Sequence, residues 1–315
     1  KGVMMRTLGI GATAFSVLLL ITLLVYMAAD REKKTLNDDE RVHLGGTYLK
    51  LSAGVTHYEL TGPAEGKVVV FVHGFSVAMY NWDLQVQALT RAGFRVLRYD
   101  LYGRGYSDRP EAQYDAALFV TQLRDLLDAL KITKPVNLVG LSLGGPVVAH
   151  FAAAYPVRVE RLVLLAPVVQ SVVNDAKFKP LRMPVVGNFI MRVLAVKTIT
   201  ERGLALLKSI DASGKYAAMF KAQTEYSGYS YALRSLICGD LFSDQIETYK
   251  KAVNNAKRIL LLWGTADTDI SAEMIARLRG AVPGIEYHEL KGIGHDLNYT
   301  AADIINPLII DFLKQ

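Results

Sequence analysis

The stretch Val136-Asn137-Leu138-Val139-Gly140-Leu141-Ser142-Leu143-Gly144-Gly145 decides the fold. Its first half is largely apolar, which is typical of a strand buried on both faces of a sheet. Glycines flank the serine in a G-x-S-x-G pattern, and a helical pattern begins directly after it. A strand, a tight turn and a helix in this order expose the central hydroxyl at the end of a sheet. Ser142 is therefore the candidate nucleophile.

Apolar runs alternate with helical patterns on both sides of this turn. Val68–Val72 is continuously apolar, whereas 47–52 and 55–60 alternate as an antiparallel hairpin would. Alternating strands and helices favour an α/β fold with a mostly parallel, doubly wound sheet, and ligands bind at the carboxyl ends of its strands. The other predicted strands are 95–99, 136–140, 161–165, 258–263 and 285–289, and the predicted helices are 80–91, 114–130, 143–154, 271–280 and 301–314.

The interval 168–255 interrupts this alternation. Its pattern is largely helical, so we interpret it as a helical cap inserted between two parts of the core, 47–167 and 256–315. Between residues 171 and 235 stand ten Lys or Arg residues and four acids, interspersed with large apolar side chains. Helices with one basic and one apolar face bind anionic lipid surfaces. The apolar side chains are equally consistent with simple packing of the cap on the core.

The segment 7–29 contains 23 residues without Asp, Glu, Lys, Arg or His. At about 1.5 Å per residue, a helix of that length crosses a hydrocarbon core of about 30 Å. We therefore predict one N-terminal transmembrane helix, followed by a charged linker over 30–46. A cleaved signal peptide is the weaker interpretation, because small residues do not occupy the cleavage positions near Ala28. A homodimer formed through this segment stays open.

A serine hydroxyl becomes a nucleophile when a neighbouring base takes its proton. His295 lies in a loop between the strand 285–289 and the last helix, at the carboxyl edge of the predicted sheet, and is the candidate base. Asp267 follows the strand 258–263 at the same edge and would orient the imidazole. Asp269 is the rival carboxylate, although an acid there also suits the start of the helix at 271.

An oxyanion formed by nucleophilic attack requires preorganised backbone N–H donors. We assign one to Leu143, directly after the nucleophile. The second is assigned to Phe75, in the His73-Gly74-Phe75-Ser76 loop that follows the strand 68–72. His73 itself is predicted to hold this loop by hydrogen bonds rather than to act in catalysis.

These motifs, taken together, resemble the α/β-hydrolase superfamily, and the order Ser, Asp, His along the chain is that of this fold. Within it, the chain is similar to membrane-anchored monoacylglycerol lipases and bacterial inner-membrane phospholipases A. That resemblance rests on the N-terminal segment, the position of the cap and the length. Ser76 departs from the proline that many members carry after the oxyanion-loop motif. The motifs that carry the resemblance are His73-Gly74-Phe75, Asp100, Gly103-Arg104-Gly105-Tyr106-Ser107-Asp108, Gly140 to Gly145, Gly264 with Asp267, and Gly292-Ile293-Gly294-His295.

The expected function is hydrolysis of fatty acyl esters such as monoacylglycerol, lysophospholipid or phospholipid, at a bacterial inner membrane. A C–C bond hydrolase or thioesterase with the same triad is the alternative, and a non-enzymatic binding protein on a hydrolase scaffold is a second one. The net charge of +6 suits anionic lipids, and no motif for nucleic acid is present. We expect no cofactor and no metal.

Overall fold

The computed structural model describes the backbone of residues 2–170, 176–255 and 258–315, and side chains within 13–170, 178–253 and 258–315. Two parts of predicted segments lie outside the described residues: 171–175 of the cap and 256–257 of the second core part. For 7–12 of the predicted transmembrane segment, only the backbone is described.

Eight strands form one sheet in the order β1-β2-β4-β3-β5-β6-β7-β8. β1 and β2 pair as an antiparallel hairpin, β2 is antiparallel to β4, and all later neighbours are parallel. The predicted mostly parallel α/β sheet is thus confirmed. The strands are β1 (Thr47–Leu51), β2 (Gly54–Thr61), β3 (Val68–Val72), β4 (Arg95–Tyr99), β5 (Val136–Leu141), β6 (Val159–Leu165), β7 (Ile259–Gly264) and β8 (Glu286–Leu290).

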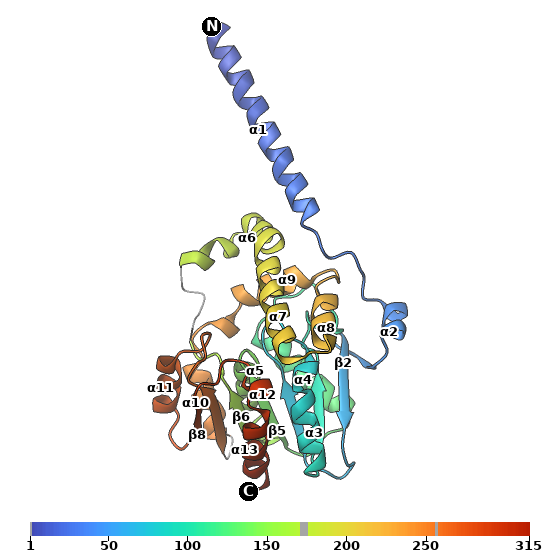
Figure 1. Ribbon diagram of the computed structural model, residues 1–315, viewed down its shortest axis with the longest axis vertical. Helices are drawn as coiled ribbons and strands as arrows, with labels where there is room; N and C mark the ends of the chain where they lie inside the picture. Colours follow the sequence, from blue (N-terminus) through green and yellow to red (C-terminus); the bar gives the residue numbers. More distant parts are fainter. Residues whose placement is uncertain (1, 171–175, 256–257) are drawn as a thin grey trace.

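Helices cover both faces of this sheet (Figure 1). α3 packs beside α13 on one face, and α4, α5, α10 and α11 follow one another across the other. Because both faces are covered, every residue of β5 and β7 is buried, as their apolar sequences require. These elements are η1 (Met79–Trp82), α3 (Asp83–Arg91), α4 (Ala116–Ala129), α5 (Gly144–Ala154), η2 (Pro156–Arg158), α10 (Ile246–Asn255), α11 (Ala272–Ala281), α12 (Leu297–Thr300) and α13 (Ala302–Lys314).

The segment between β6 and α10, which we call the cap, stands over one end of the sheet (Figure 1). α10 lies within the predicted cap interval 168–255 but packs against α5 beside the sheet. The division of the chain into core and cap stays a prediction. The cap elements are η3 (Ala176–Arg182), α6 (Pro184–Ile190), η4 (Met191–Ala195), α7 (Val196–Ile210), α8 (Lys215–Gln223), α9 (Tyr229–Cys238) and η5 (Asp240–Phe242).

The N-terminal helix α1 (Gly2–Ala28) projects away from the rest of the molecule (Figure 1). Its described apolar side chains, from Phe15 to Met27, are largely exposed. Within the described residues, no helix is both long and apolar enough to cross a bilayer. The predicted transmembrane helix over 7–29 is not supported by this finding.

Residues 30–46, predicted as a linker, form an ordered strap along the cap. The strap contains helix α2 (Asp38–Leu44), because Asn37 caps its first turn by accepting from the Glu40 amide at 2.9 Å. Lys34 forms a β-bridge with Tyr226, and Glu32 accepts from the amides of Gly228 and Ser230, both at 2.7 Å. The amides lie at the start of α9, where a carboxylate is favoured. The strap thus holds one end of the cap.

Candidate active site

Ser142 occupies a strained turn between β5 and α5. Its φ is +55°, a left-handed conformation that costs a non-glycine residue about 1–2 kcal/mol. The turn has no room for side chains beside it. A Cβ on Gly140 would lie 2.4 Å from the Gly144 carbonyl oxygen, and one on Gly144 would lie 2.2 Å from that of Val72. Glycine is therefore required at both positions, because only without side chains there can β5 and α5 approach closely enough to expose Ser142.

Asp267 and His295 come together from loops that follow β7 and β8. The Asp267 carboxylate is fully buried, and its Oδ2 lies 2.9 Å from Nδ1 of His295. Its Oδ1 accepts from the amides of Asp269 and Ile270 at 2.8 and 2.9 Å. These three bonds fix the carboxylate and one edge of the imidazole, and leave Nε2 of His295 to face another group.

The rival carboxylate, Asp269, is engaged elsewhere. It forms an exposed ion pair with Arg202 of the cap at 2.7 Å. The carboxylate that contacts His295 is therefore that of Asp267 and not that of Asp269, and the orienting role of Asp267 stays a prediction. Within the described residues, no hydrogen bond joins the Ser142 hydroxyl to His295. Catalytic hydrogen bonds of unliganded enzymes are often long and tighten only around the substrate.

The loop after β3 lies directly beside the nucleophile. A Cβ on Gly74 would lie 3.4 Å from that of Ser142. In the described part of the chain, neither the Phe75 amide nor the Leu143 amide donates a hydrogen bond to the protein. Two backbone N–H groups that have no acceptor in the described protein can stabilise an oxyanion that forms next to the serine. Their roles as the oxyanion hole stay a prediction.

The core holds this loop through His73 and Arg104, and both are completely buried. His73 has Nδ1 at 2.9 Å from the Gly74 carbonyl oxygen and accepts at Nε2 from the Leu101 amide. Burial lowers the pKa of His73 to about 4, so it is neutral at pH 7. Its structural role was predicted. Arg104 donates to the Phe75 carbonyl at 2.8 Å, and burial lowers its pKa to about 10, so it remains charged.

A profile of the family described as "Alpha/beta hydrolase family" matches residues 69–306. The chain belongs to the alpha/beta hydrolase family. The predicted superfamily is thereby confirmed, and with it the general character of the protein as a hydrolase.

Relatives within this family are named for several different activities. It is 29% identical to a "Putative non-heme chloroperoxidase" of Synechocystis sp., over 82% of this chain and 94% of that protein. It is 28% identical to a 2-hydroxy-6-oxononadienedioate/2-hydroxy-6-oxononatrienedioate hydrolase of Paraburkholderia phymatum, over 86% of this chain and 93% of that one. These names do not support the closer resemblance to monoacylglycerol lipases or phospholipases A.

Among solved structures, a thermophilic esterase from Thermogutta terrifontis superposes with a TM-score of 0.71. The match covers 85% of this chain and 98% of the esterase, at 21% sequence identity. An identity this low bears on the fold alone, and it agrees with the sheet order described above.

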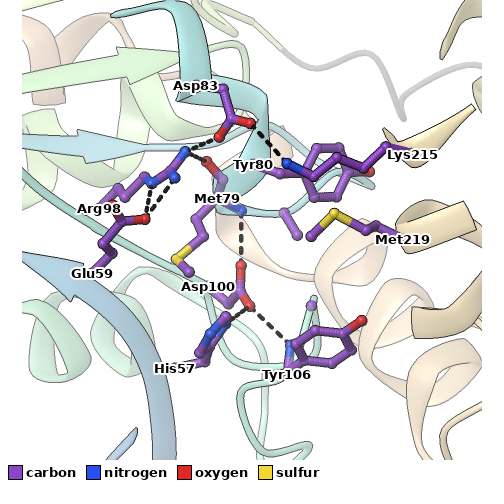
Figure 2. A pocket seen from close by; sticks show the side chains of 12 residues that line it. His57, Glu59, Met79, Tyr80, Asp83, Arg98, Asp100, Tyr106, Lys215 and Met219 are labelled. Atoms are coloured by element: carbon purple, nitrogen blue, oxygen red, sulfur yellow. Dashed lines mark hydrogen bonds and ion pairs between the residues drawn. The ribbon is translucent and has the colours of Figure 1, made fainter. Parts of the chain in front are cut away.

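Sequence reasoning missed a second His–Asp pair in this hydrolase, shown in Figure 2. Nδ1 of His57 lies 2.7 Å from Oδ2 of Asp100, and both side chains are buried. Asp100 also accepts from the amides of Met79 and Tyr106. Burial acts to raise the pKa of Asp100, but the contacts with His57, His73 and the Met79 amide together lower that pKa below its usual value. The pair lines a pocket beside residues 73–79 after β3, which we call the oxyanion loop for its predicted role. Asp100 fixes the far end of this loop through the Met79 amide.

A buried glutamine of the cap, Gln223, also escaped sequence reasoning. It contacts the oxyanion loop and the loop after β4, which are separated from it by more than a hundred residues. No local motif marks such a residue. A polar side chain between Ala222 and Thr224 on a predicted cap helix gives no signal of its own.

Proposed function

We propose that this family member is a serine hydrolase that works through an acyl-enzyme. The observation that carries the proposal is the His295–Asp267 pair at the same sheet edge as the strained Ser142. Nε2 of His295 would take the hydroxyl proton as the Ser142 oxygen attacks a substrate carbonyl carbon. Asp267 would hold the required tautomer and stabilise the imidazolium.

The amides of Phe75 and Leu143 would hold the negative oxygen of the tetrahedral intermediate. Its collapse breaks the bond to the leaving group, which takes the proton from His295. Water, deprotonated by the same imidazole, then attacks the acyl-enzyme and releases the acid and free Ser142. Oxygen, protons and charge balance without any further reactant.

For the substrate, the curated relatives favour C–C bond hydrolysis over lipid hydrolysis. One of them is named for an oxo-dicarboxylate substrate, and it aligns over most of both chains. The basic excess of the cap supports a negatively charged substrate of this kind. We therefore place a C–C bond hydrolase first, with an ester as the simpler substrate of the same machinery.

Hydrolysis of fatty acyl esters at a membrane is the second candidate, and a specific observation favours it. The apolar side chains of α1 are exposed, and the cap next to it exposes Met183, Val185 and Leu194. Tyr26 at the base of α1 stacks on Phe189 of α6, with ring centroids 6.2 Å apart, so the two apolar surfaces adjoin. Such a surface suits lipid better than water.

Two measurements test these proposals on the full chain. A fluorophosphonate probe should label the protein but not its Ser142→Ala variant; absence of labelling would favour the non-enzymatic binding protein. Turnover is then compared for a 2-hydroxy-6-oxo-dienoate, acyl-CoA thioesters, monoacylglycerol, lysophospholipid and p-nitrophenyl esters of rising chain length. Preference for the dienoate supports the first candidate, and preference for long acyl esters supports the second.

Flotation with vesicles that contain phosphatidylglycerol tests the association with lipid. We expect the full chain to float, and Leu18→Glu in α1 to reduce the floating fraction. Val157, like Leu18, is an exposed apolar residue, 82% against 63% exposed, but it lies outside α1 and the cap, so Val157→Glu is the control. Equal flotation of both variants would contradict a role for α1.

A further inference from the structure

The cap contributes a buried polar contact to the oxyanion loop. Gln223, at the end of α8, is completely buried. Its Nε2 donates to the Ser76 carbonyl at 2.8 Å, and its Oε1 accepts from the Gly105 amide at 2.8 Å. One side-chain amide thus bonds two separate loops of the core, and both of its polar atoms are satisfied.

Apolar packing reinforces this contact. Phe220 and Ala217 of α8 form a small hydrophobic cluster with Ala78 and Tyr80, at the end of the oxyanion loop. Tyr80 also stacks on Tyr216, with ring centroids 5.5 Å apart. This cluster is separate from the main core, so the cap and the oxyanion loop share a packing unit of their own.

The core fixes the far end of the same loop. Asp100 accepts from the Met79 amide at 2.7 Å, and Arg98 donates to the Met79 carbonyl at 3.2 Å (Figure 2). Nearer the nucleophile, Arg104 holds the Phe75 carbonyl, but the neighbouring Gly105 is itself held by Gln223. Core side chains thus hold the Gly74 and Phe75 carbonyls, and the cap holds the next one, that of Ser76.

We propose that Gln223 is a positioning residue that couples docking of the cap to formation of the oxyanion hole. The inference rests on the proposed serine hydrolase function. When α8 packs against the core, the side-chain amide of Gln223 fixes the Ser76 carbonyl and the Gly105 amide. The Phe75 amide then faces the substrate carbonyl. When α8 lifts, the Ser76 carbonyl and the Gly105 amide lose their partner together, and the donor is released. The active site is then complete only under a closed cap.

Two substitutions separate the contacts of Gln223. Gln223→Met has a similar length but bonds neither loop, whereas Gln223→Glu keeps an acceptor for Gly105 and loses the donor to Ser76. Lys221→Met, at an exposed position of the same helix, is the control. With p-nitrophenyl acetate, we expect kcat per active site to fall about tenfold or more in both Gln223 variants, since losing one oxyanion donor costs about 10²–10³. KM should change by less than about twofold, because the donor acts mainly in the transition state.

Active sites are counted with the fluorophosphonate, so that misfolded protein does not lower kcat. A methyl trifluoromethyl ketone, whose adduct places an oxyanion in the hole, should bind more weakly by the same factor as kcat/KM falls. An unchanged kcat per site, or unchanged ketone affinity in a folded variant, overturns the coupling. Absence of labelling and turnover in the unsubstituted protein overturns the proposed function as well.

Hydrogen exchange of the unsubstituted protein gives a second test, which holds even where both variants fail to fold. The Gly105 amide and the amides of α8 should open together, with equal protection. Protection of Gly105 that persists while α8 exchanges would overturn the proposal.

Discussion

Replacement of Asp267 by Asn tests the orientation of the base most directly. Oδ1 of Asp267 accepts from two backbone amides, and Oδ2 faces Nδ1 of His295. An asparagine would keep its carbonyl oxygen on the two amides and turn its NH2 group toward His295. Nδ1 must then accept, so the proton of the neutral ring moves to Nε2. That nitrogen can no longer take the proton of Ser142.

The cost follows from the tautomer. A base held in the wrong tautomer slows a serine hydrolase by about 10⁴. At about 1.36 kcal/mol for each factor of ten, the barrier rises by roughly 5.5 kcal/mol. We expect Asp267→Asn to lower kcat on p-nitrophenyl acetate by this factor, with its thermal midpoint close to that of the unsubstituted protein, because both backbone bonds survive.

Asp269→Asn is the matched control. It removes an exposed ion pair with Arg202, a type of contact worth about 0–1 kcal/mol, and it leaves the imidazole untouched. Its kcat should stay within about twofold of the unsubstituted value. If Asp267→Asn keeps more than a tenth of kcat, or if Asp269→Asn is equally impaired, the assignment of the orienting carboxylate is wrong.

Three further predictions concern stability. Phe220→Ala should lower the free energy of unfolding by about 3–5 kcal/mol in urea titrations, because it empties a fully buried site, whereas Val185→Ala, 83% exposed, should change it little. Burial lowers the pKa of His73 to about 4. Between about pH 6.5 and 4 the unfolded chain therefore binds a proton at His73 that the folded chain does not bind. Stability should thus fall by about 2 kcal/mol from pH 7 to pH 5, and His73→Gln should flatten that slope; an equally steep slope in the variant would rule out His73 as its source. Gly144→Ala should prevent soluble expression, since its Cβ would lie 2.2 Å from the Val72 carbonyl oxygen, and a folded, active variant would contradict the tight-turn geometry.

Continuous apolar runs predicted the sheet well because burial on both faces leaves a pattern within each strand. β3 and β5 were located to within a residue, and the loops after β7 and β8 bring Asp267 and His295 together because parallel strands end at one edge. The site could be anticipated to the extent that each residue follows a recognisable strand.

Contacts between distant segments were beyond the reach of the sequence. Helix α2 was overlooked because charge suggested a linker, although Asn37 followed by acids is a helix start. The pairing of His57 with Asp100 and the position of Gln223 depend on how loops meet in space, which no periodicity reveals. Apolar composition over 7–29 suggested a membrane span that the described residues do not bear out.

The strap has a practical consequence for anyone who shortens the protein to improve its solubility. Deletion of residues 1–46 would remove Glu32, the acceptor for the two amides that open α9, together with the bridge between Lys34 and Tyr226. Tyr226 lies three residues from Gln223, so the shortened protein would lose a contact that supports the segment bonded to Ser76 and Gly105. Deletion that stops at residue 28 would keep the contacts of Glu32 and Lys34 with the cap.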